Sequence, residues 1–490
     1  MLESNPIDEK WNVGGRRPQG IIVSTTTVYP SIAHPNRGIF VARRLAALHA
    51  IRPVMVVAPR PWFPLLRPLD GREFSTARSI GRPSKAPDVL RPSMFYLPGV
   101  FKHRDADYFA RALRPVIRAI RASHSIVAID AHFEWPDAVG AWIVARENRI
   151  PFLCTLRGKL VSAARHSKIR RRVAEMLRDA SGLIAVSQSL ADLAARIAGT
   201  SRRIRVIPNG IDRTIFNRSA PIANVSGHDA ASRSLLGWDS HARYVVAVGH
   251  IQRLKGFHRL VDIWPEVRAR VGDIRLILVG DESGEPAYSK ELRRRIARVN
   301  KSISSRGGGC IRLLNGAPPM QIACMLNAAD LFALTSESEG WCNAIAESLA
   351  CGCPVVATDV GGNRELVSDP DMGMLVPLDD RQALVDAVVR SLTRSWNRRA
   401  IASAGGERDW KVVGRQCAEA IDDVTGRTTV GVDGNRERSG EQYGVRRLPV
   451  ESFSPSKDRP PMAACVIDYN AGLQRGPHPV RQTSGAIAHD

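Results

Sequence analysis

Short apolar runs recur along residues 20–424, and most of them are followed by a polar loop and then by a helical pattern. Apolar runs bounded by Gly, Pro and Asn indicate strands that are buried on both faces. A strand, a loop, a helix and another strand in succession need a crossover connection, so we predict parallel sheets. The predicted strands are 20–24, 54–58, 126–130, 151–155, 183–187, 204–207, 244–248, 274–280, 311–314, 330–334 and 355–357.

The chain of 490 residues is too long for one hydrophobic core, and its pattern divides into two α/β halves. Within the first half, the Pro- and Arg-rich residues 65–100 indicate a long irregular connection. Helices are predicted over residues 39–50, 105–123, 340–352, 381–393 and 407–424. The expected organisation is a disordered leader (1–19), a first Rossmann-like domain (20–216), a linker (217–231), a second Rossmann-like domain (232–406), a last helix (407–424) and a disordered tail (425–490).

Two acidic residues bracket the predicted helix that ends at Gly352. Glu339 precedes it and Glu347 lies two turns along, about 12 Å away on nearly the same face, so the two acids can hold both ends of an extended ligand. The helix start favours an anion, and a sugar joined to a nucleotide through a diphosphate has that shape and charge. The alternative is an acidic turn that only caps the helix. Four backbone N–H groups lie at the predicted start, those of Gly340, Trp341, Cys342 and Asn343.

Three other turns carry candidate chemistry. Residues 249–256 follow a predicted strand and place Lys255 before a helix, as a phosphate site would. Gly38 opens a helix, where it either admits a phosphate or an acceptor or is a simple cap. His132 lies just past the strand 126–130, at the edge where open α/β sheets bind ligands, although most single His residues are structural.

These segments together resemble the retaining glycosyltransferases of family 4, which have the GT-B fold. Glu339 and Glu347 match the family's E-x7-E pair, and the strings EGWCNAIAE and ACGCPVVATDVGG are similar to a bacterial polysaccharide-assembly branch. A second similarity to that branch lies in the string NRGIFV of residues 36–41 and in VVAPRPWFP of residues 56–64. The resemblance covers residues 20–424, and Cys342 stands where the branch usually has Pro.

The resemblance also implies roles for single residues. Glu339 would contact the donor sugar, Glu347 the ribose, and Lys255 the diphosphate. His250 stands where the family usually has Arg, which removes one permanent charge from the diphosphate site. His132 would point at the donor sugar from the first domain, and the last helix would cross back to that domain. The candidate catalytic residues are His132, Lys255 and Glu339; the donor-binding candidates are Gly249, His250, Lys255, Gly316, Glu339, Gly340, Trp341, Cys342, Asn343 and Glu347; the acceptor or cleft candidates are Gly38 and Arg157.

The surface charge limits the candidate partners. A net charge of +22 and a pI near 10.4 favour polyanions, anionic lipids or anionic substrates. Nucleic acid is disfavoured, because the sequence has no zinc-finger spacing, RNP-type string or basic region with heptads. The helix 105–123 and the cluster 168–172 present basic faces, which are either solvated or contact anionic lipid. Arginines share one face of the first of these segments, at Arg111, Arg114, Arg118 and Arg121.

The expectations for cofactors and cellular location rest on sequence patterns that are absent. The eight cysteines form neither a disulfide framework nor a zinc-finger spacing, and no Asp-x-Asp pair marks a metal site. We therefore expect no metal and no cofactor besides a nucleotide-sugar co-substrate. The first twenty residues have no apolar h-region, and no run of eighteen apolar residues occurs. We expect a cytoplasmic protein, with peripheral contact to the inner face of the plasma membrane as an option.

The resulting hypothesis is a retaining hexosyltransferase. It would move a hexose from a nucleotide-diphosphate sugar to a saccharide or lipid-linked saccharide acceptor in bacterial cell-surface polysaccharide biosynthesis. Lys255 and the helix start would stabilise the charge on the departing diphosphate. One alternative is a nucleotide-sugar epimerase, which would convert the donor without an acceptor. The other is a non-catalytic scaffold that binds polyanions or membranes, with steep salt dependence and no transfer.

Overall fold

Two parallel sheets organise the chain. The structure is a computed structural model that describes residues 20–63, 86–97, 99–218, 228–282, 284–303 and 310–426. The predicted leader 1–19 lies outside these residues, as do residues 219–227 of the predicted linker and the predicted tail from residue 427 onward. All elements described below belong to one contact unit, residues 1–427.

The first sheet has seven strands in the order β4-β2-β1-β6-β7-β8-β9, and every neighbouring pair is parallel. All five residues of β1 are buried, which accounts for its unbroken apolar start. The strands are β1 (Ile21–Thr25), β2 (Val54–Val57), β4 (Asp88–Leu90), β6 (Ile126–His132), β7 (Phe152–Leu156), β8 (Gly182–Ala185) and β9 (Arg205–Val206).

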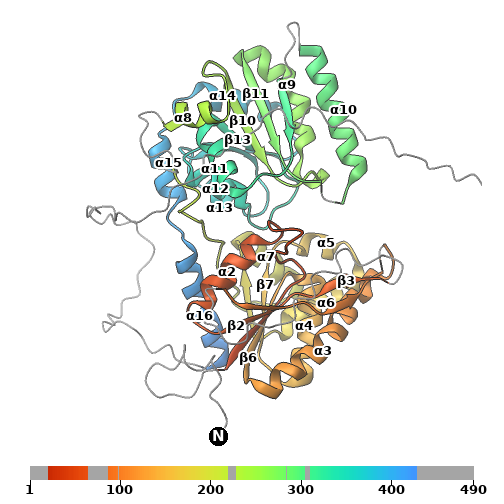
Figure 1. Ribbon diagram of the computed structural model, residues 1–490. Coiled ribbons are helices and arrows are strands. Elements are labelled where there is room, and N and C mark those ends of the chain that lie inside the picture. The colour runs from red at the N-terminus through yellow and green to blue at the C-terminus, as the bar shows by residue number, and fades with distance from the viewer. Residues whose placement is uncertain are drawn as a thin grey trace, which may run out of the picture. The chain divides into compact units, whose positions relative to one another are not determined.

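Helices cover both faces of this sheet. The helix α2 packs on one face together with α16, and α3, α4 and α6 pack on the other (Figure 1). The helices of this half are α2 (Ile39–His49), α3 (Asp105–Ser123), α4 (Val139–Asn148), α5 (Leu160–Ala164), α6 (Ser167–Asp179) and α7 (Gln188–Ala198), with short turns η1 (Lys102–Arg104) and η2 (Glu134–Ala138).

The prediction of an irregular connection over residues 65–100 was wrong for part of its length. The edge strand β4 pairs with β2 in the register Met55 to Asp88, and β5 (Ser93–Phe95) pairs with β3 (Arg60–Trp62) in a separate two-stranded sheet. These strands are three residues long and have no apolar run of their own. Their pairing partners hold them in place, so local sequence gives little signal for them. Residues 64–85 lie outside the described part.

The second sheet has six parallel strands in the order β12-β11-β10-β13-β14-β15. The chain runs outward from β10 to β12 and then returns to β13 on the other side of β10. The loops after β10 and β13 therefore diverge where the strand order reverses, which is where doubly wound sheets bind ligands. The strands are β10 (Arg243–Val248), β11 (Ile274–Val279), β12 (Ile311–Leu314), β13 (Leu331–Leu334), β14 (Val355–Thr358) and β15 (Gly373–Val376).

The helices of the second half differ from prediction at several positions. The predicted last helix 407–424 is α16 (Trp410–Thr425), whose start is fixed by Asp409 accepting the backbone N–H of Val412 at 2.9 Å. The helix α8 starts at His228, so residues 228–231 are helical and not linker. The helices are α8 (His228–Leu235), α9 (Phe257–Val271), α10 (Pro286–Ile303), α11 (Pro319–Ala328), α12 (Asn343–Ala350), α13 (Asn363–Leu366), α14 (Arg381–Thr393), α15 (Arg398–Gly405) and α16, with the turn η3 (Arg253–Lys255).

The helix α16 returns to the first half and packs on α2. Val413, Cys417 and Ile421 join the buried cluster that contains residues of β1 and α2. Arg52 and Asp422 add an ion pair of 2.8 Å at the edge of this contact. The chain of the second half thereby ends on the first half, which ties the two halves together at a point away from the sheet reversal.

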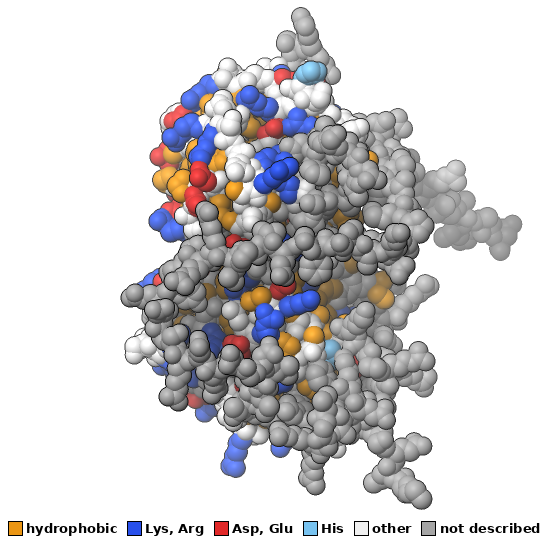
Figure 2. All heavy atoms as spheres, turned by 90° about the vertical axis from the view of Figure 1, so that its left-hand side faces the viewer, with side chains coloured by type: hydrophobic (Ala, Val, Ile, Leu, Met, Phe, Trp, Pro, Cys, Tyr) orange, Lys and Arg blue, Asp and Glu red, His pale blue; other side chains and the backbone are white. Residues whose placement is uncertain are grey.

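Basic side chains are dispersed over the surface. The four arginines on the outer face of α3 are exposed, but Arg114 pairs with Glu147 at 2.8 Å and Arg121 donates to the side chain of Asn148 at 2.7 Å. Figure 2 shows Lys and Arg side chains interspersed with Asp and Glu on the face in view. Contact with an anionic membrane stays a prediction. None of the described helices combines the length and apolar character that crossing a bilayer requires.

Candidate functional site

The loop after β13 carries Glu339, and α12 follows it. The helix begins at Asn343 and not at Gly340, so its predicted start was wrong. A Cβ on Gly340 would come 2.7 Å from the carbonyl oxygen of Arg157 in the first half, and Cys342 has extended backbone angles. Packing against the first half therefore holds residues 340–342 out of the helix. The first amides of the helix belong to Asn343, Ala344 and Ile345, and the last two also face the thiol of Cys342.

The loop after β10 meets the loop after β13. Gly256 has a left-handed φ of 70°, and a Cβ there would come 1.9 Å from the carbonyl oxygen of Thr335, so only Gly fits. This packing brings Nζ of Lys255 to 2.6 Å from Oε1 of Glu339, which also accepts a hydrogen bond from Ser336 Oγ at 2.7 Å. Burial opposes the charge of Lys255, but the carboxylate of Glu339 outweighs it and raises the pKa of the ammonium. The structure thus brings together two candidates that the sequence placed far apart.

Glu347 lies on α12 and is partly buried. Burial raises the pKa of Glu347 to about 7, and Arg43 of α2 offsets part of that rise. Its carboxylate has no hydrogen-bond donor among the residues that the structure describes. A carboxylate with both oxygens available suits a ligand that presents hydroxyl groups, as a ribose does.

The remaining donor candidates line the same sheet edge. Gly316 donates its backbone N–H to Asp281 at 2.9 Å, and a Cβ there would come 2.3 Å from the Asp281 carboxylate. Gly249 directly follows β10, and a Cβ on it would make only ordinary contacts. Desolvation and the nearby Lys255 lower the pKa of His250, so this ring is neutral at pH 7. Burial raises the pKa of the Cys342 thiol to about 12, so the residue that replaces the family's Pro is also uncharged.

His132 is the last residue of β6 and is fully buried, whereas the sequence placed it just past the strand. Its Nδ1 accepts a hydrogen bond from Nε of Arg157 at 3.1 Å, and its Nε2 lies 3.2 Å from Asp130. Burial lowers the pKa of His132 to about 4, although Asp130 opposes this, so the ring is neutral. Nδ1 of His132 therefore faces the guanidinium of Arg157, and Nε2 faces the carboxylate of Asp130.

Arg157 connects the first half to α12. Its guanidinium donates to Oδ1 of Asn209 at 3.2 Å, and Nδ2 of Asn209 donates to Oδ1 of Asn343 at 2.9 Å. Burial and the neighbouring Arg44 lower the pKa of Arg157 to about 9, which leaves the group charged at pH 7. A chain of side chains therefore runs from Asp130 through His132, Arg157 and Asn209 to the first residue of the donor-side helix.

Two buried polar residues of the site were not predicted. Neither Asn209 nor Glu134 is among the candidates taken from the sequence. The carboxylate of Glu134 accepts the backbone N–H groups of residues 157, 158 and 159 at 2.9, 3.2 and 3.0 Å, so it fixes the loop that carries Arg157. A buried carboxylate needs hydrogen-bond donors, and this need is the signal that could have pointed to Glu134. Its donors are more than twenty residues away in the sequence, so residue spacing does not reveal them.

Gly38 has a structural explanation. It caps α2 with a left-handed φ of 70°, and a Cβ there would come 2.3 Å from the carbonyl oxygen of Val28. The chain itself makes the close approach that requires Gly, which favours the simple cap over a ligand contact.

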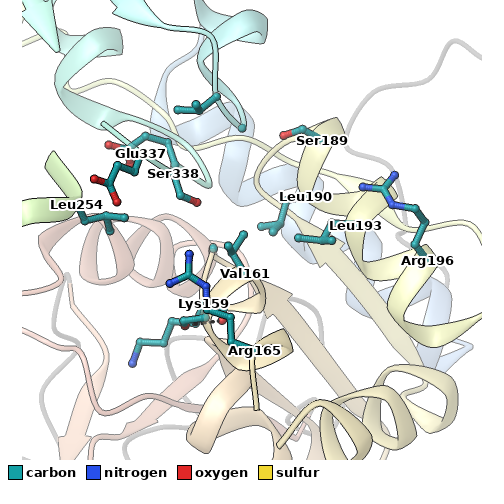
Figure 3. Close-up of a pocket in the computed structure, with 15 residues that line it drawn as sticks. Lys159, Val161, Arg165, Ser189, Leu190, Leu193, Arg196, Leu254, Glu337 and Ser338 are labelled. Atoms are coloured by element: carbon teal, nitrogen blue, oxygen red, sulfur yellow. Dashed lines mark hydrogen bonds between the residues drawn. The ribbon is translucent and has the colours of Figure 1, made fainter. Parts of the chain in front are cut away.

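The two halves touch through backbone beside the site. A Cβ on Gly158 would come 3.1 Å from the backbone N of Gly340. Glu365 of α13 accepts the backbone N–H groups of Gln188 and Ser189 at the start of α7, at 2.8 and 3.1 Å. These contacts frame a cavity of about 550 Å³ that is lined by both halves and includes Glu339 (Figure 3). The described residues contain no group of three His, Cys, Asp or Glu side chains arranged to hold a metal ion.

Solved structures establish the class of fold. Anabaena Alr3699/HepE in complex with UDP and glucose superposes with a TM-score of 0.62 at 22% identity, covering 83% of this chain and 100% of that one. Sucrose-phosphate synthase from Thermosynechococcus elongatus superposes with a TM-score of 0.64 at 19% identity, with the same coverage of 83% and 100%. At this sequence identity the similarity shows the fold alone. The protein has two Rossmann-like parallel sheets and therefore has the GT-B fold.

Sequence comparisons establish the family. Residues 41–214 match "Glycosyltransferase Family 4" and residues 242–394 match "Glycosyl transferases group 1". The "Putative teichuronic acid biosynthesis glycosyltransferase TuaC" of Bacillus subtilis (strain 168) is 28% identical over 382 residues, which are 75% of this chain and 88% of that protein. The D-inositol 3-phosphate glycosyltransferase of Segniliparus rotundus is 34% identical over 179 residues, 36% of this chain and only 37% of that protein. The chain belongs to glycosyltransferase family 4 and is a glycosyltransferase.

Proposed function

We propose that this glycosyltransferase moves a hexose, with retention of configuration, from a nucleotide-diphosphate sugar to a saccharide or lipid-linked saccharide acceptor. The pathway is the cytoplasmic assembly of a bacterial cell-surface polysaccharide. The observation that carries the proposal is the contact of Lys255 with Glu339 at the strand-order reversal, directly before the start of α12. A cation, an acid and helix amides at one sheet edge suit a sugar diphosphate.

The donor would lie across this edge. Lys255 and the first amides of α12 stabilise the charge that grows on the departing diphosphate, Glu339 orients the sugar, and Glu347 accepts the ribose hydroxyls. In the transfer step the acceptor oxygen bonds to the anomeric carbon while the carbon–oxygen bond to the diphosphate breaks. The nucleoside diphosphate leaves with the bonding electron pair, and the proton of the acceptor hydroxyl passes to the departing phosphate oxygen.

The first half would act through Arg157. Its partner Asn209 holds Asn343 at the start of α12, and His132 holds Arg157 in turn. We therefore assign His132 as a positioning residue and not as a group that touches the sugar. The His132→Gln variant should lower kcat while the donor Kd stays near the wild-type value, because Gln cannot reproduce both contacts of the ring.

The relatives suggest which donor and pathway to test first. Structures of the Anabaena protein contain UDP, glucose or UDP-glucose. The name of the Bacillus subtilis relative refers to teichuronic acid biosynthesis. UDP-hexoses are therefore the first donors to test with this chain.

A panel of nucleotide-sugars tested by thermal shift identifies the donor, since a ligand at 100 times its Kd stabilises the protein by about 2.7 kcal/mol. The chosen donor is then incubated with and without a saccharide acceptor, and the product is analysed by NMR. Transfer with retained anomeric configuration supports the proposal. Conversion of the donor to its epimer without an acceptor indicates an epimerase instead. Salt-sensitive polyanion binding without donor binding indicates a scaffold.

Single substitutions test which acidic residue contacts the donor. Glu347→Ala should raise the donor KM strongly, whereas Glu175→Ala, which removes an acid on α6 that pairs with Arg171, should not. Equal donor KM values for these two variants would argue against the assignment of the ribose to Glu347.

A further inference from the structure

A layer of buried polar side chains lies at the carboxyl end of the first sheet, on the face that α2 and α16 cover. The apolar cluster on this face includes one residue from each of the strands β1, β6 and β7: Ile22, Ala128 and Leu153. Side chains alternate along a strand, so Ser24, Asp130 and Thr155, two positions further along, lie on the same face. The sheet register also pairs Ser24 with Asp130. Apolar packing between sheet and helices therefore gives way to polar groups at this edge.

Two guanidinium groups belong to this layer. Arg44 of α2 donates through Nε to Sγ of Cys417 and through Nη1 to a backbone carbonyl oxygen, at 3.2 and 3.1 Å. Arg157, which follows β7, uses Nε and Nη1 for His132 and Asn209. After burial, the charge of Arg44 contributes most to the lowered pKa of Arg157, which places the two cations near each other.

Neither guanidinium has a carboxylate partner in the part of the chain that the structure describes. Asp130 lies in the layer, but one of its oxygens accepts the hydroxyl of Thr155 at 3.1 Å and the other lies 3.2 Å from His132. The nearby Glu134 accepts three backbone N–H groups. Buried charges are normally paired, because an unpaired one loses its hydration without compensation, so the two cations call for a counter-ion.

Three side-chain donors of the layer have no hydrogen-bond partner among the described residues: Ser24 Oγ, Arg44 Nη2 and Arg157 Nη2. Ser24 is 0% exposed, Arg44 is 1% exposed and Arg157 is 9% exposed. Guanidinium nitrogens only donate and a Ser hydroxyl can donate, so the group that satisfies them must accept. A water molecule could accept two of these bonds, but it would leave both cations without a counter-ion. Donors and unpaired charge together favour an anion.

We propose that this layer is a binding site for a small monovalent anion such as chloride, held between the guanidinium groups of Arg44 and Arg157 with the hydroxyl of Ser24 as a third donor. A phosphate is larger and carries about two negative charges, so a monatomic anion suits this depth better. Arg157 is the least buried of the three donors, so the anion would enter from its side.

The anion site adjoins the polar chain that leads to α12. Arg157 donates to Asn209, and Asn209 donates to Asn343 at the helix start. An anion on Nη2 would hold the guanidinium in the orientation that this chain needs, so it would act on transfer through position alone. Anion binding goes beyond the proposed transfer reaction, and it can be measured without donor or acceptor.

Thermal unfolding of the full chain tests binding in solution, with sodium chloride compared with sodium gluconate at equal ionic strength. Gluconate is too large to enter the layer. The Tm should rise with chloride and then reach a plateau, since a ligand that binds only the folded state stabilises it. A protein with a net charge of +22 also attracts anions to its surface, so variants must separate the two effects.

Arg44→Met and Ser24→Ala should each lose most of the chloride-specific rise in Tm. Arg118→Gln is the matched control and should keep it, because Arg118 is exposed on the outer face of α3. Should Arg44→Met fail to fold, Ser24→Ala decides, since it removes only a hydroxyl group. The same chloride-specific rise in the wild type and in the buried variants would assign the effect to the surface and overturn the proposal.

Anomalous scattering locates the anion directly. In crystals of the full chain soaked in sodium bromide, we expect an anomalous peak within hydrogen-bond distance of Arg44 Nη2, Arg157 Nη2 and Ser24 Oγ. Density there without an anomalous signal would identify a water molecule, and that result would also overturn the proposal.

Transfer activity tests the positioning effect. When gluconate replaces chloride, kcat should fall about tenfold, as the loss of one charge-assisted hydrogen bond would give, while the donor Kd changes little. An unchanged kcat beside proven anion binding would overturn the positioning effect. Absence of transfer in both salts would count against the proposed function and not against the anion site.

Discussion

Donor affinity should fall as the pH falls from 8 to 6, because Glu347 titrates in this range. Burial raises the pKa of Glu347 to about 7, so the carboxyl is ionised above that pH and protonated below it. In the proposed complex the ribose hydroxyls donate to the ionised form, so binding would select the deprotonated protein. If only that form binds, the apparent Kd is multiplied by 1 + 10^(pKa − pH), which is about 1.1 at pH 8 and about 11 at pH 6. The expected loss is about tenfold, or about 1.4 kcal/mol.

The assay is isothermal titration with the intact nucleotide-sugar, whose diphosphate bridge keeps its charge over this range. Glu347→Gln is the matched control, since the amide has the same shape and does not titrate. Its donor Kd should be weaker at pH 8 and nearly independent of pH. His250 also titrates at the proposed diphosphate site, but protonation of this ring would strengthen diphosphate binding and so has the opposite sign. A slope that persists in the Gln variant, or affinity that rises toward pH 6, refutes the reasoning.

Three further perturbations test the site. Lys255→Ala should lower kcat/KM at least about tenfold, or about 1.4 kcal/mol, because the departing diphosphate loses its cation; wild-type steady-state rates would contradict the assignment. Gly340→Ala places a Cβ 2.7 Å from the carbonyl oxygen of Arg157, so the two halves must move apart at this contact. We expect kcat to fall while the donor Kd changes little. An unchanged kcat would mean that the contact is dispensable. Glu365→Ala removes the acceptor of two N–H groups at the start of α7, which lie at 2.8 and 3.1 Å. The loss should lower the stability of α7 by about 1 kcal/mol, as the loss of a helix cap does. Hydrogen exchange of α7 measures this change, and unchanged protection would count against the cap.

Most strands could be predicted from sequence because each is an apolar run, and β1, β2, β13 and β14 are buried along their whole length. The helices α3 and α14 were predicted with the correct bounds for a related reason: each has a continuous apolar stripe and polar ends. The start of α12 could not be placed, because residues 340–342 lie outside the helix, where Gly340 packs against Arg157 of the first half, about 180 residues earlier in the chain. Local propensity carries no information about such a contact. The strand β4 was missed for the same reason, since its pairing with β2 defines it.

The residues of the candidate site also differ in whether local sequence patterns could predict them. The segments around Lys255 and Glu339 could be found, because a Gly turn before a helix and an acid at a strand end are local patterns. Their contact at 2.6 Å follows from the sheet order, in which β10 and β13 are neighbours, and this order is a property of the whole second half. Asn209 was missed because its importance lies in its two partners, Arg157 and Asn343, and neither is near it in sequence.

The polar chain from Asp130 to Asn343 explains why residues remote from the donor loops matter for the site. Arg157 is buried, and burial lowers its pKa to about 9, so its charge depends on the acceptors that surround it. Those acceptors belong to β6 and to the turn at Asn209, and the chain ends on the first residue of α12, whose amides face the proposed diphosphate. A displacement of the first half would therefore act directly on the helix start that we propose stabilises the leaving group. The links from His132 through Arg157 and Asn209 to Asn343 are single hydrogen bonds, so one substitution is enough to remove any of them.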